Sequence, residues 1–133
     1  MAKTYNVFIS HSWDHVDDLM NLRRLLENRG YFKVVFLETP PHDPINSSNA
    51  YYIKAKIKAH IEAADVVIGL AGLYASVSEW MQWELETAQN LKRPILGVVP
   101  WGQINVSRVV QEKAKEVVRW NTESIVDAIR RLG

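Results

Sequence analysis

The stretch Val66 to Leu70 reads Val-Val-Ile-Gly-Leu, an unbroken apolar run that decides the fold class. A strand exposed on one face alternates apolar and polar side chains, whereas a strand of a parallel sheet covered on both faces is apolar throughout. A second run of this kind, Pro94 to Val99, follows it along the chain. The two runs predict central strands of a parallel sheet with helices on both sides.

Shorter β-rich runs and helical periods flank these two strands. The runs Tyr5 to Ile9, Lys33 to Leu37 and Val117 to Trp120 predict three further strands. Between the strands, apolar residues recur every three or four positions, which predicts helices. The predicted helices run from a cap at Ser12 or Asp14 to Gly30, from a cap at Ser47 or Ser48 to Ala64, from Ser76 to Leu91, from Val106 to Lys115, and onward from a cap at Asn121 or Thr122.

Strand and helix alternate five times, so we expect one α/β domain over residues 1–133 with a flavodoxin-like, three-layer architecture. Right-handed crossovers then favour a five-stranded parallel sheet of order 2-1-3-4-5. Ligands of such sheets bind beyond the carboxyl ends of the strands, near strands one and three. The loop Ser10 to Asp14, the proline-rich loop Glu38 to Asn49 and the start of the third helix would therefore surround one crevice.

Composition excludes several classes of protein. The 133 residues carry 16 basic and 15 acidic side chains without a clustered basic excess, so we expect no binding to nucleic acid. The absence of cysteine excludes disulfide scaffolds, thiolate metal sites and a cysteine nucleophile. The longest nearly apolar run, Val66 to Ala75, is far shorter than the roughly 20 residues of a membrane span. The amino terminus has no apolar signal core, and we expect a cytoplasmic protein with no membrane contact.

One charged residue, Glu84, falls on the apolar side of the third predicted helix. On a helical wheel, its neighbours within about 60° are Val77, Trp80, Met81, Ala88 and Leu91. A buried carboxylate is costly unless it is paired, neutralised or open to a cleft. One explanation is structural: a salt bridge to Arg23, Arg24 or Arg93, or a side chain that reaches solvent through a gap in the apolar stripe. We favour the other, an active-site carboxylate in a crevice with Ser10 and Trp80, because misplaced carboxylates cluster at active sites.

Other sites are less clearly indicated. In the loop after the first strand, Ser10, His11 and Ser12 can hydrogen-bond a phosphate or a ribose, although helix capping explains the same residues. His11, Asp14 and His15 lack the helical histidine pair of a typical zinc site, so we expect no metal. The chain also lacks the G-x-S-x-G, Walker A and G-x-G-x-x-G patterns.

Four pieces of sequence occur in an order and spacing typical of one family. They are Val7 to Ser12 (VFISHS), Ile57 to Val67 (IKAHIEAADVV), Tyr74 with Ser78 to Leu85 (SEWMQWEL), and Lys92 to Ile95 (KRPI). Together, over about residues 5 to 100, they resemble the TIR-like domains of prokaryotes. They are most similar to the small family that includes the signalling component of the Thoeris antiphage system. The S-x-W-x-x-x-E-L piece is the most specific.

The resemblance implies an enzyme, because many TIR domains cleave NAD+ at the nicotinamide–ribose bond and some cyclise the ADP-ribose into a second messenger. Glu84 matches their catalytic glutamate, and the loop Glu38 to Asn49 matches their substrate-facing loop. The loop here is proline-rich and lacks the glycine common in the family. The candidate substrate-binding residues are then Ser10, His11, Ser12, Asp14, Glu38, Ser48 and Trp80.

The resemblance also implies that NAD+ is a substrate with no separate cofactor, that a downstream effector protein responds to the product, and that the chain self-associates. Two alternatives stay open: a nucleoside deoxyribosyltransferase-like enzyme, and a non-catalytic TIR-like adaptor that binds other TIR domains. A phosphorylated receiver domain is disfavoured, because the third strand ends in Gly69 to Gly72 and has no phosphoacceptor aspartate there.

Overall fold

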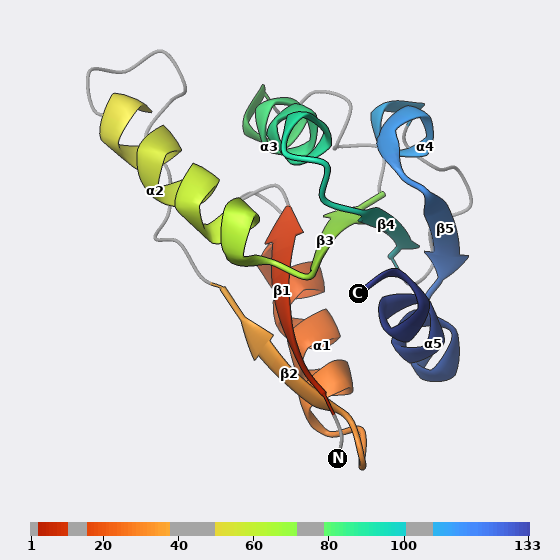
Figure 1. The fold of residues 1–133 in the computed structure, drawn as a ribbon. Coiled ribbons are helices and arrows are strands. Elements are labelled where there is room, and N and C mark those ends of the chain that lie inside the picture. The colour runs from red at the N-terminus through yellow and green to blue at the C-terminus, as the bar shows by residue number, and fades with distance from the viewer. Residues whose placement is uncertain (1–2, 11–15, 38–49, 72–78, 101–107) are drawn as a thin grey trace.

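The computed structural model describes residues 3–10, 16–37, 50–71, 79–100 and 108–133, and structural statements below refer to these. Strands and helices alternate along the chain (Figure 1). The strands are β1 (Thr4–Ser10), β2 (Lys33–Phe36), β3 (Val66–Leu70), β4 (Ile95–Val99) and β5 (Glu116–Arg119). The helices are α1 (Val16–Glu27), α2 (Ala50–Ala63), α3 (Glu79–Asn90), α4 (Arg108–Lys113) and α5 (Thr122–Leu132).

The strands form a single five-stranded parallel sheet of order β2-β1-β3-β4-β5, which confirms the predicted topology. Every residue of β3 and β4 is buried, as their unbroken apolar sequences predict for central strands. The edge strands β2 and β5 are only half-buried at best. In the register, Ser10 at the carboxyl end of β1 is the partner of Gly69 in β3.

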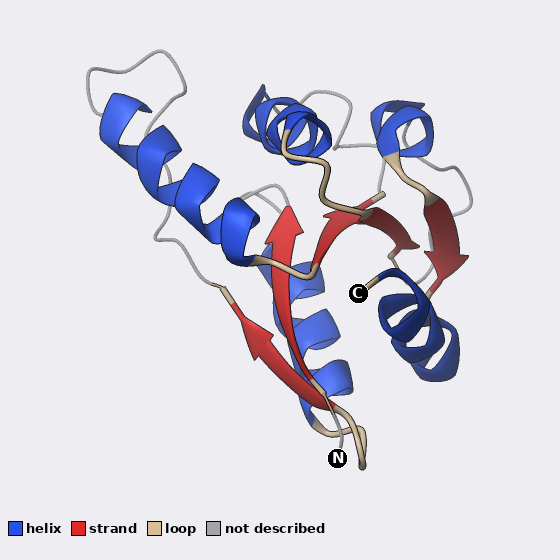
Figure 2. Ribbon diagram, viewed as in Figure 1, coloured by secondary structure: helices blue, strands red, loops and turns tan. Residues whose placement is uncertain are grey.

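Helices cover both faces of the sheet and make the α/β sandwich three layers deep (Figure 2). On one face, the buried residues of α1 and α5 pack against the sheet: Leu22, Leu26, Ile125, Val126, Ala128 and Ile129. On the other face, α2, α3 and α4 bury Ile57, Ile61, Met81, Leu85, Ala88 and Val110. The helical stripes read from the sequence therefore face the sheet, and two apolar clusters stabilise it from opposite sides.

Where the structure describes them, the ends of the elements agree with the sequence prediction to within three residues. Helix α4 ends at Lys113, two residues before the predicted end at Lys115, and β5 begins at Glu116, one residue before the predicted start at Val117. Helix termini lack half of their backbone hydrogen bonds, so sequence patterns define them poorly. The α5 cap is well defined: the Asn121 side chain accepts a hydrogen bond from the Ser124 backbone N–H at 3.0 Å. The predicted caps Ser12, Asp14, Ser47 and Ser48 lie outside the described residues.

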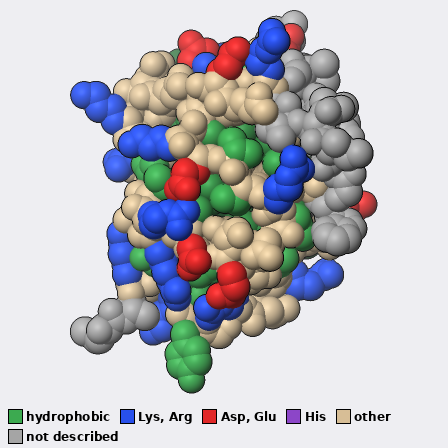
Figure 3. All heavy atoms as spheres, turned by 90° about the vertical axis from the view of Figure 1, so that its right-hand side faces the viewer, with side chains coloured by type: hydrophobic (Ala, Val, Ile, Leu, Met, Phe, Trp, Pro, Cys, Tyr) green, Lys and Arg blue, Asp and Glu red, His purple; other side chains and the backbone are tan. Residues whose placement is uncertain are grey.

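Basic and acidic side chains intermingle on the face of the molecule that carries α5 (Figure 3). Two ion pairs lie there: Arg29 with Glu123 at 2.8 Å and Arg131 with Glu116 at 2.7 Å. The first pair joins the turn after α1 to the first turn of α5, two segments far apart in the sequence. Over the described part of the chain, no helix is both long enough and apolar enough to cross a membrane.

Candidate active site

The carboxyl end of β1 and helix α3 meet on the face of the sheet that α2, α3 and α4 cover. The reason lies in the neighbouring strand. A Cβ atom added to Gly69 would stand 3.3 Å from Leu85 Cδ2, so the missing side chain lets α3 approach β3 closely. Gly69 is the register partner of Ser10, and Leu85 follows Glu84 in the helix. The close approach therefore brings Glu84 to the end of β1.

Ser10 and Glu84 form a buried hydrogen bond at this contact. The Ser10 hydroxyl donates to Glu84 Oε1 over 2.7 Å, and the exposed fractions of the two residues are 0% and 2%. Ser10 and Glu84 are also the buried polar residues of the described chain. A hydroxyl that donates to a carboxylate stabilises its charged form, because a charge-assisted hydrogen bond replaces part of the lost hydration. The pair can therefore hold a carboxylate in fixed orientation among apolar neighbours.

The residues next to Glu84 on the surface of helix α3 are buried or half-buried, as the helical wheel predicts. Met81, Leu85 and Ala88 are buried beside Glu84, whereas the polar residues of the helix on the opposite side are exposed: Glu79, Gln82, Glu86, Gln89 and Asn90. Glu84 is thus the charged residue of an otherwise apolar face. Such a placement is costly for folding, and it is typical of residues that a protein keeps for chemistry.

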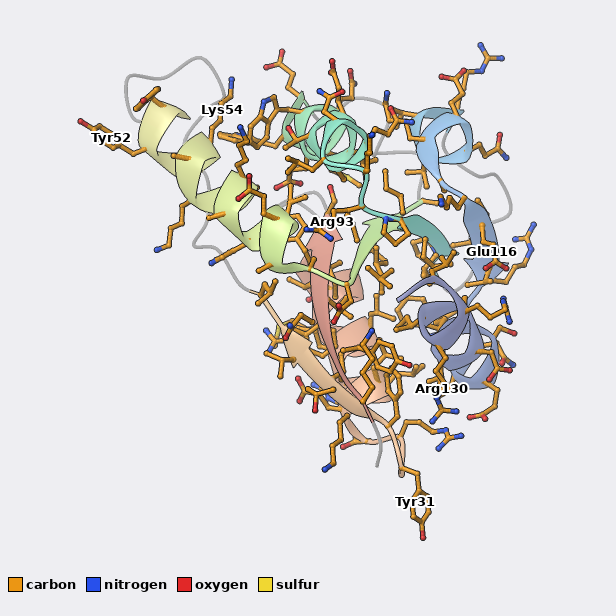
Figure 4. The ribbon with its side chains drawn as sticks, viewed as in Figure 1. Tyr31, Tyr52, Lys54, Arg93, Glu116 and Arg130 are labelled. Atoms are coloured by element: carbon orange, nitrogen blue, oxygen red, sulfur yellow. The ribbon has the colours of Figure 1, made fainter. Side chains whose placement is uncertain are left out.

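Aromatic side chains line the junction of α2 and α3 near this face. The half-buried Trp80 ring lies edge to face with the Trp83 ring, with 5.9 Å between the centroids. Lys54 of α2 places its Nζ atom 5.5 Å from the Trp83 centroid, and Figure 4 shows Lys54 on the α3 side of α2. Trp80 therefore stands one helical turn from Glu84 within an aromatic pair, and its contact with a substrate stays a prediction.

The arginines considered as partners for Glu84 take other positions. Arg23 contacts Glu27 at 3.5 Å and lies 5.2 Å from the Phe36 ring centroid. Arg24 and Arg93 are exposed, and neither forms a side-chain ion pair within the described segments. The described geometry therefore gives Glu84 a hydroxyl partner on β1, and it shows no salt bridge from Arg24 or Arg93.

Five of the predicted substrate-binding residues lie outside the described residues: His11, Ser12, Asp14, Glu38 and Ser48. Chain connectivity alone relates the first three to the site, because they follow Ser10 directly. Within the described ranges, no group of three or more His, Asp or Glu side chains could hold a metal ion. The roles of these five residues stay predictions.

The bond between Ser10 and Glu84 is the feature that the sequence prediction missed. The sequence predicts Ser10 beside Glu84 as a residue that contacts a substrate, and it does not predict that the buried Ser10 hydroxyl donates to the carboxylate. The contact of Ser10 with a substrate stays a prediction. One signal could have indicated the hydrogen bond. Side chains alternate along a strand, so Ser10 lies on the same face as Phe8, and Phe8 packs in the cluster that contains α3.

Comparison with known proteins identifies one family and a common fold. The family profile described as "Thoeris protein ThsB, TIR-like domain" matches residues 8–105, which include both Ser10 and Glu84. A search of curated protein sequences finds no match.

Several solved structures share the fold at low sequence identity. A 2-deoxyribosyltransferase from Bacillus psychrosaccharolyticus has 16% identity and a TM-score of 0.62, with 92% of this chain and 90% of that chain covered. The CMP N-glycosidase BcmB from Clostridium botulinum has 13% identity and a TM-score of 0.57, with 94% and 98% covered. Era, bound to MgGDPNP and a segment of 16S ribosomal RNA, has 16% identity and a TM-score of 0.67, with 99% and 57% covered. At this identity, the likeness extends to the fold alone.

Proposed function

The chain belongs to the TIR-like domain family of the Thoeris protein ThsB, and from this premise we propose that it is an NAD+-consuming signalling enzyme of antiphage defence. In this proposal it cleaves the bond between nicotinamide and ribose. The ADP-ribose part then reacts with water or closes on itself to a cyclic second messenger. The observation that supports the proposal most strongly is the buried Glu84 carboxylate, held by Ser10 at the carboxyl edge of the sheet.

The proposed reaction follows from the chemistry of glycosidic bonds. The bond between ribose C1′ and the nicotinamide nitrogen breaks, and its electron pair neutralises the positive charge of the pyridinium ring. The ribose is left as an oxocarbenium-like cation. Nicotinamide leaves as a neutral molecule, so the step requires neither a general acid nor a metal. The protein has to stabilise the positive charge that develops on the sugar.

Glu84 is the residue that we propose for this task. A carboxylate in a site of low dielectric stabilises a nearby cation far more than a carboxylate in water, and its fixed orientation avoids a cost of reorganisation. It would also orient the ribose hydroxyl groups. Attack by water releases one proton and gives ADP-ribose, whereas attack by a nucleophile of the same molecule gives a cyclic product. Exclusion of water favours the cyclic product.

Ser10 is a positioning residue in this mechanism. Its hydroxyl is fully buried and donates to Glu84 Oε1, so it acts on the reaction through the carboxylate. A packed and hydrogen-bonded carboxylate keeps a narrow range of orientations. NAD+ is the proposed substrate and no separate cofactor is invoked. The proposed partners are an effector protein that responds to the product and further copies of this chain.

A nucleoside deoxyribosyltransferase-like reaction is the second candidate. The 2-deoxyribosyltransferase and the CMP N-glycosidase match almost the full length of this chain in fold, and their names describe chemistry at the bond between a sugar and a base. That bond breaks through the same type of cation, so a carboxylate at the position of Glu84 would serve both reactions. The two candidates differ in the substrate and share the proposed carboxylate.

Substrate choice separates the candidates in one experiment. The full chain is incubated at high protein concentration, which favours self-association, with NAD+ in one reaction and with a deoxynucleoside plus a second free base in another. Products are separated by liquid chromatography and identified by mass. Release of nicotinamide with ADP-ribose or a cyclic isomer supports the NAD+ proposal. Exchange of bases on deoxyribose supports the second candidate, and two unchanged substrates favour the adaptor reading.

A further inference from the structure

A concave site lies at the opposite end of the sheet from Glu84. It is a hollow of about 250 Å³ at the amino ends of β1 and β2, lined by Lys3, Tyr5, Tyr31, Phe32, Lys33 and Arg130. Tyr5 lines the hollow and lies five residues before Ser10, which ends strand β1. At about 3.3 Å per residue, the two places are roughly 17 Å apart. The hollow is therefore distinct from the candidate active site.

Stacked aromatic rings form one wall of the hollow. The Tyr5 and Phe32 rings lie 5.7 Å apart at an interplanar angle of 25°. Lys3 Nζ lies 5.0 Å from the Tyr5 centroid, and the Arg130 guanidinium lies 5.5 Å from the Phe32 centroid. The attraction between a cation and the face of an aromatic ring holds the charged groups of Lys3 and Arg130 close to this wall. Three segments far apart in the sequence thus place positive charge over one aromatic surface.

Tyr31 projects into solvent beside this wall (Figure 4). Its side chain is 95% exposed, and its backbone has φ of 58°. The left-handed conformation is unfavourable for residues with a side chain, and glycine would adopt it without strain. Arg130 Nη2 donates a hydrogen bond to the Tyr31 carbonyl at 3.0 Å and supports this conformation. An exposed aromatic ring on a supported, strained backbone is a candidate stacking surface.

Carboxylates compensate the cations of the hollow only in part. Lys33 and Arg130 form no ion pair with any carboxylate in the described segments, although, after the hydrogen bond from Arg29, the charge of Arg130 contributes to the lowered pKa of Glu123. Lys3 stands 3.9 Å from Asp65, whose other oxygen accepts the Asn6 backbone N–H at 2.8 Å. Lysine at an edge strand and arginine in the last turn of a helix each have ordinary structural explanations. Their convergence on one aromatic hollow does not follow from either explanation.

We propose that this hollow binds a nucleotide, a ligand that joins an aromatic base to phosphate groups. The phosphates enter the hollow between Lys3, Lys33 and Arg130, and the base stacks outside on Tyr31. The size supports this division, because 250 Å³ is below the roughly 300–1,000 Å³ of pockets that enclose a whole drug-sized ligand. The inference goes beyond the proposed function, and the site would bind whether or not the chain cleaves NAD+.

The test is a titration of the ¹⁵N-labelled full chain with ADP, followed residue by residue in NMR spectra. Adenosine and inorganic pyrophosphate are titrated separately, so that the contributions of the base and of the phosphates can be told apart. Saturable shifts of the amides of Tyr31, Phe32 and Lys33 are expected with ADP, with weaker binding of either fragment. Shifts confined to residues around Ser10 and Glu84, or no shifts, would overturn the proposal. Pyrophosphate that binds as tightly as ADP would overturn the stacking on Tyr31.

Substitutions give the second part of the test. Lys33→Gln and Arg130→Gln are each expected to weaken ADP binding roughly three- to fivefold, as exposed charge contacts do. Tyr31→Ala should weaken it about fivefold or more, whereas Tyr31→Phe keeps the ring and should bind within about twofold of the parent chain. Lys58→Gln removes an exposed charge on α2 and is the matched control. If Lys58→Gln weakened ADP binding as much as Lys33→Gln, the net charge of the chain would explain both effects, and the proposal would be contradicted.

Discussion

At the scale of single residues, the contact between Ser10 and Glu84 links stability to chemistry. A carboxylate among Met81, Leu85 and Ala88 lowers the stability of the fold unless hydrogen bonds replace its lost water. The Ser10 hydroxyl supplies one such bond from a strand that is 74 residues away in sequence. The same bond restricts the orientation of the carboxylate. Loss of the hydroxyl should therefore affect both folding and the proposed reaction.

Ser10→Ala is expected to lower the free energy of unfolding by about 1–3 kcal/mol, because it leaves a buried acceptor with one bond fewer. It should also lower kcat for NAD+ cleavage more than it changes KM. The acid limb of the pH–rate profile should move to higher pH, because the lost bond favoured the charged carboxylate. Urea unfolding and steady-state kinetics measure these effects. Ser124→Ala, at an exposed serine of α5, is the control. An unchanged pH profile for Ser10→Ala would reduce Ser10 to a packing residue.

At the scale of elements, the amphipathic helices were predictable because burial follows the helical period. The exposed and buried sides of α3 agree with the wheel, and so does the face of α5. The contact between Ser10 and Glu84 was not predictable from periodicity, because it depends on how closely α3 approaches β3 at Gly69. Such distances are set by side-chain size on two elements at once. A pattern along one element does not contain them.

Gly97 tests the close approach of α4 to the sheet. A Cβ atom there would lie 2.8 Å from Val110 Cγ1 and 3.0 Å from Val117 Cγ2. Gly97→Ala should therefore lower the free energy of unfolding by about 1–3 kcal/mol. In a chain that already carries Val110→Ala, the added methyl group has more room, so Gly97→Ala should lower the free energy of unfolding by less. Gly30→Ala is the control, since nothing lies within 4 Å of its added Cβ. Urea unfolding that shows Gly97→Ala as stable as the parent chain would contradict this packing.

The ion pair between Arg29 and Glu123 gives a prediction for pH. The hydrogen bond from Arg29, with its charge, holds the pKa of Glu123 below the ordinary value of 4.5. A lowered pKa in the folded state contributes stability above pH 4.5, and this contribution is lost as pH falls through the lower folded value. In urea unfolding, Glu123→Gln should be less stable than the parent chain at pH 6, and the difference should become smaller as pH falls below 4.5 towards pH 3.

Glu86→Gln is the matched control for this pH experiment. Its carboxylate is exposed on α3 and has no ion-pair partner in the described part of the chain. The variant should unfold like the parent chain at both pH values. A stability difference for Glu123→Gln that stays constant from pH 6 to pH 3 would mean that the carboxylate's charge is not its cause.

At the scale of the whole molecule, the sheet has two functional ends in this account. The carboxyl end carries the pair Ser10 and Glu84, as the order β2-β1-β3-β4-β5 places ligands near β1 and β3. The amino end carries the cationic hollow around Tyr31. Sequence patterns predicted the first end, because the fold class determines where loops gather. They did not predict the second, because its residues come from three separate segments that only the folded chain brings together.

The central claim is that the Glu84 carboxylate stabilises the cation that forms on the ribose when NAD+ is cleaved. The rate of nicotinamide release by Glu84→Gln tests this claim most directly. Glutamine keeps the size of the side chain and an oxygen for the Ser10 hydroxyl, and it removes the charge. Loss of a main electrostatic contribution should lower kcat by at least about 100-fold, with circular dichroism unchanged. Glu86→Gln should cleave at the parent rate. Nicotinamide release by Glu84→Gln as fast as by the parent chain would contradict the account.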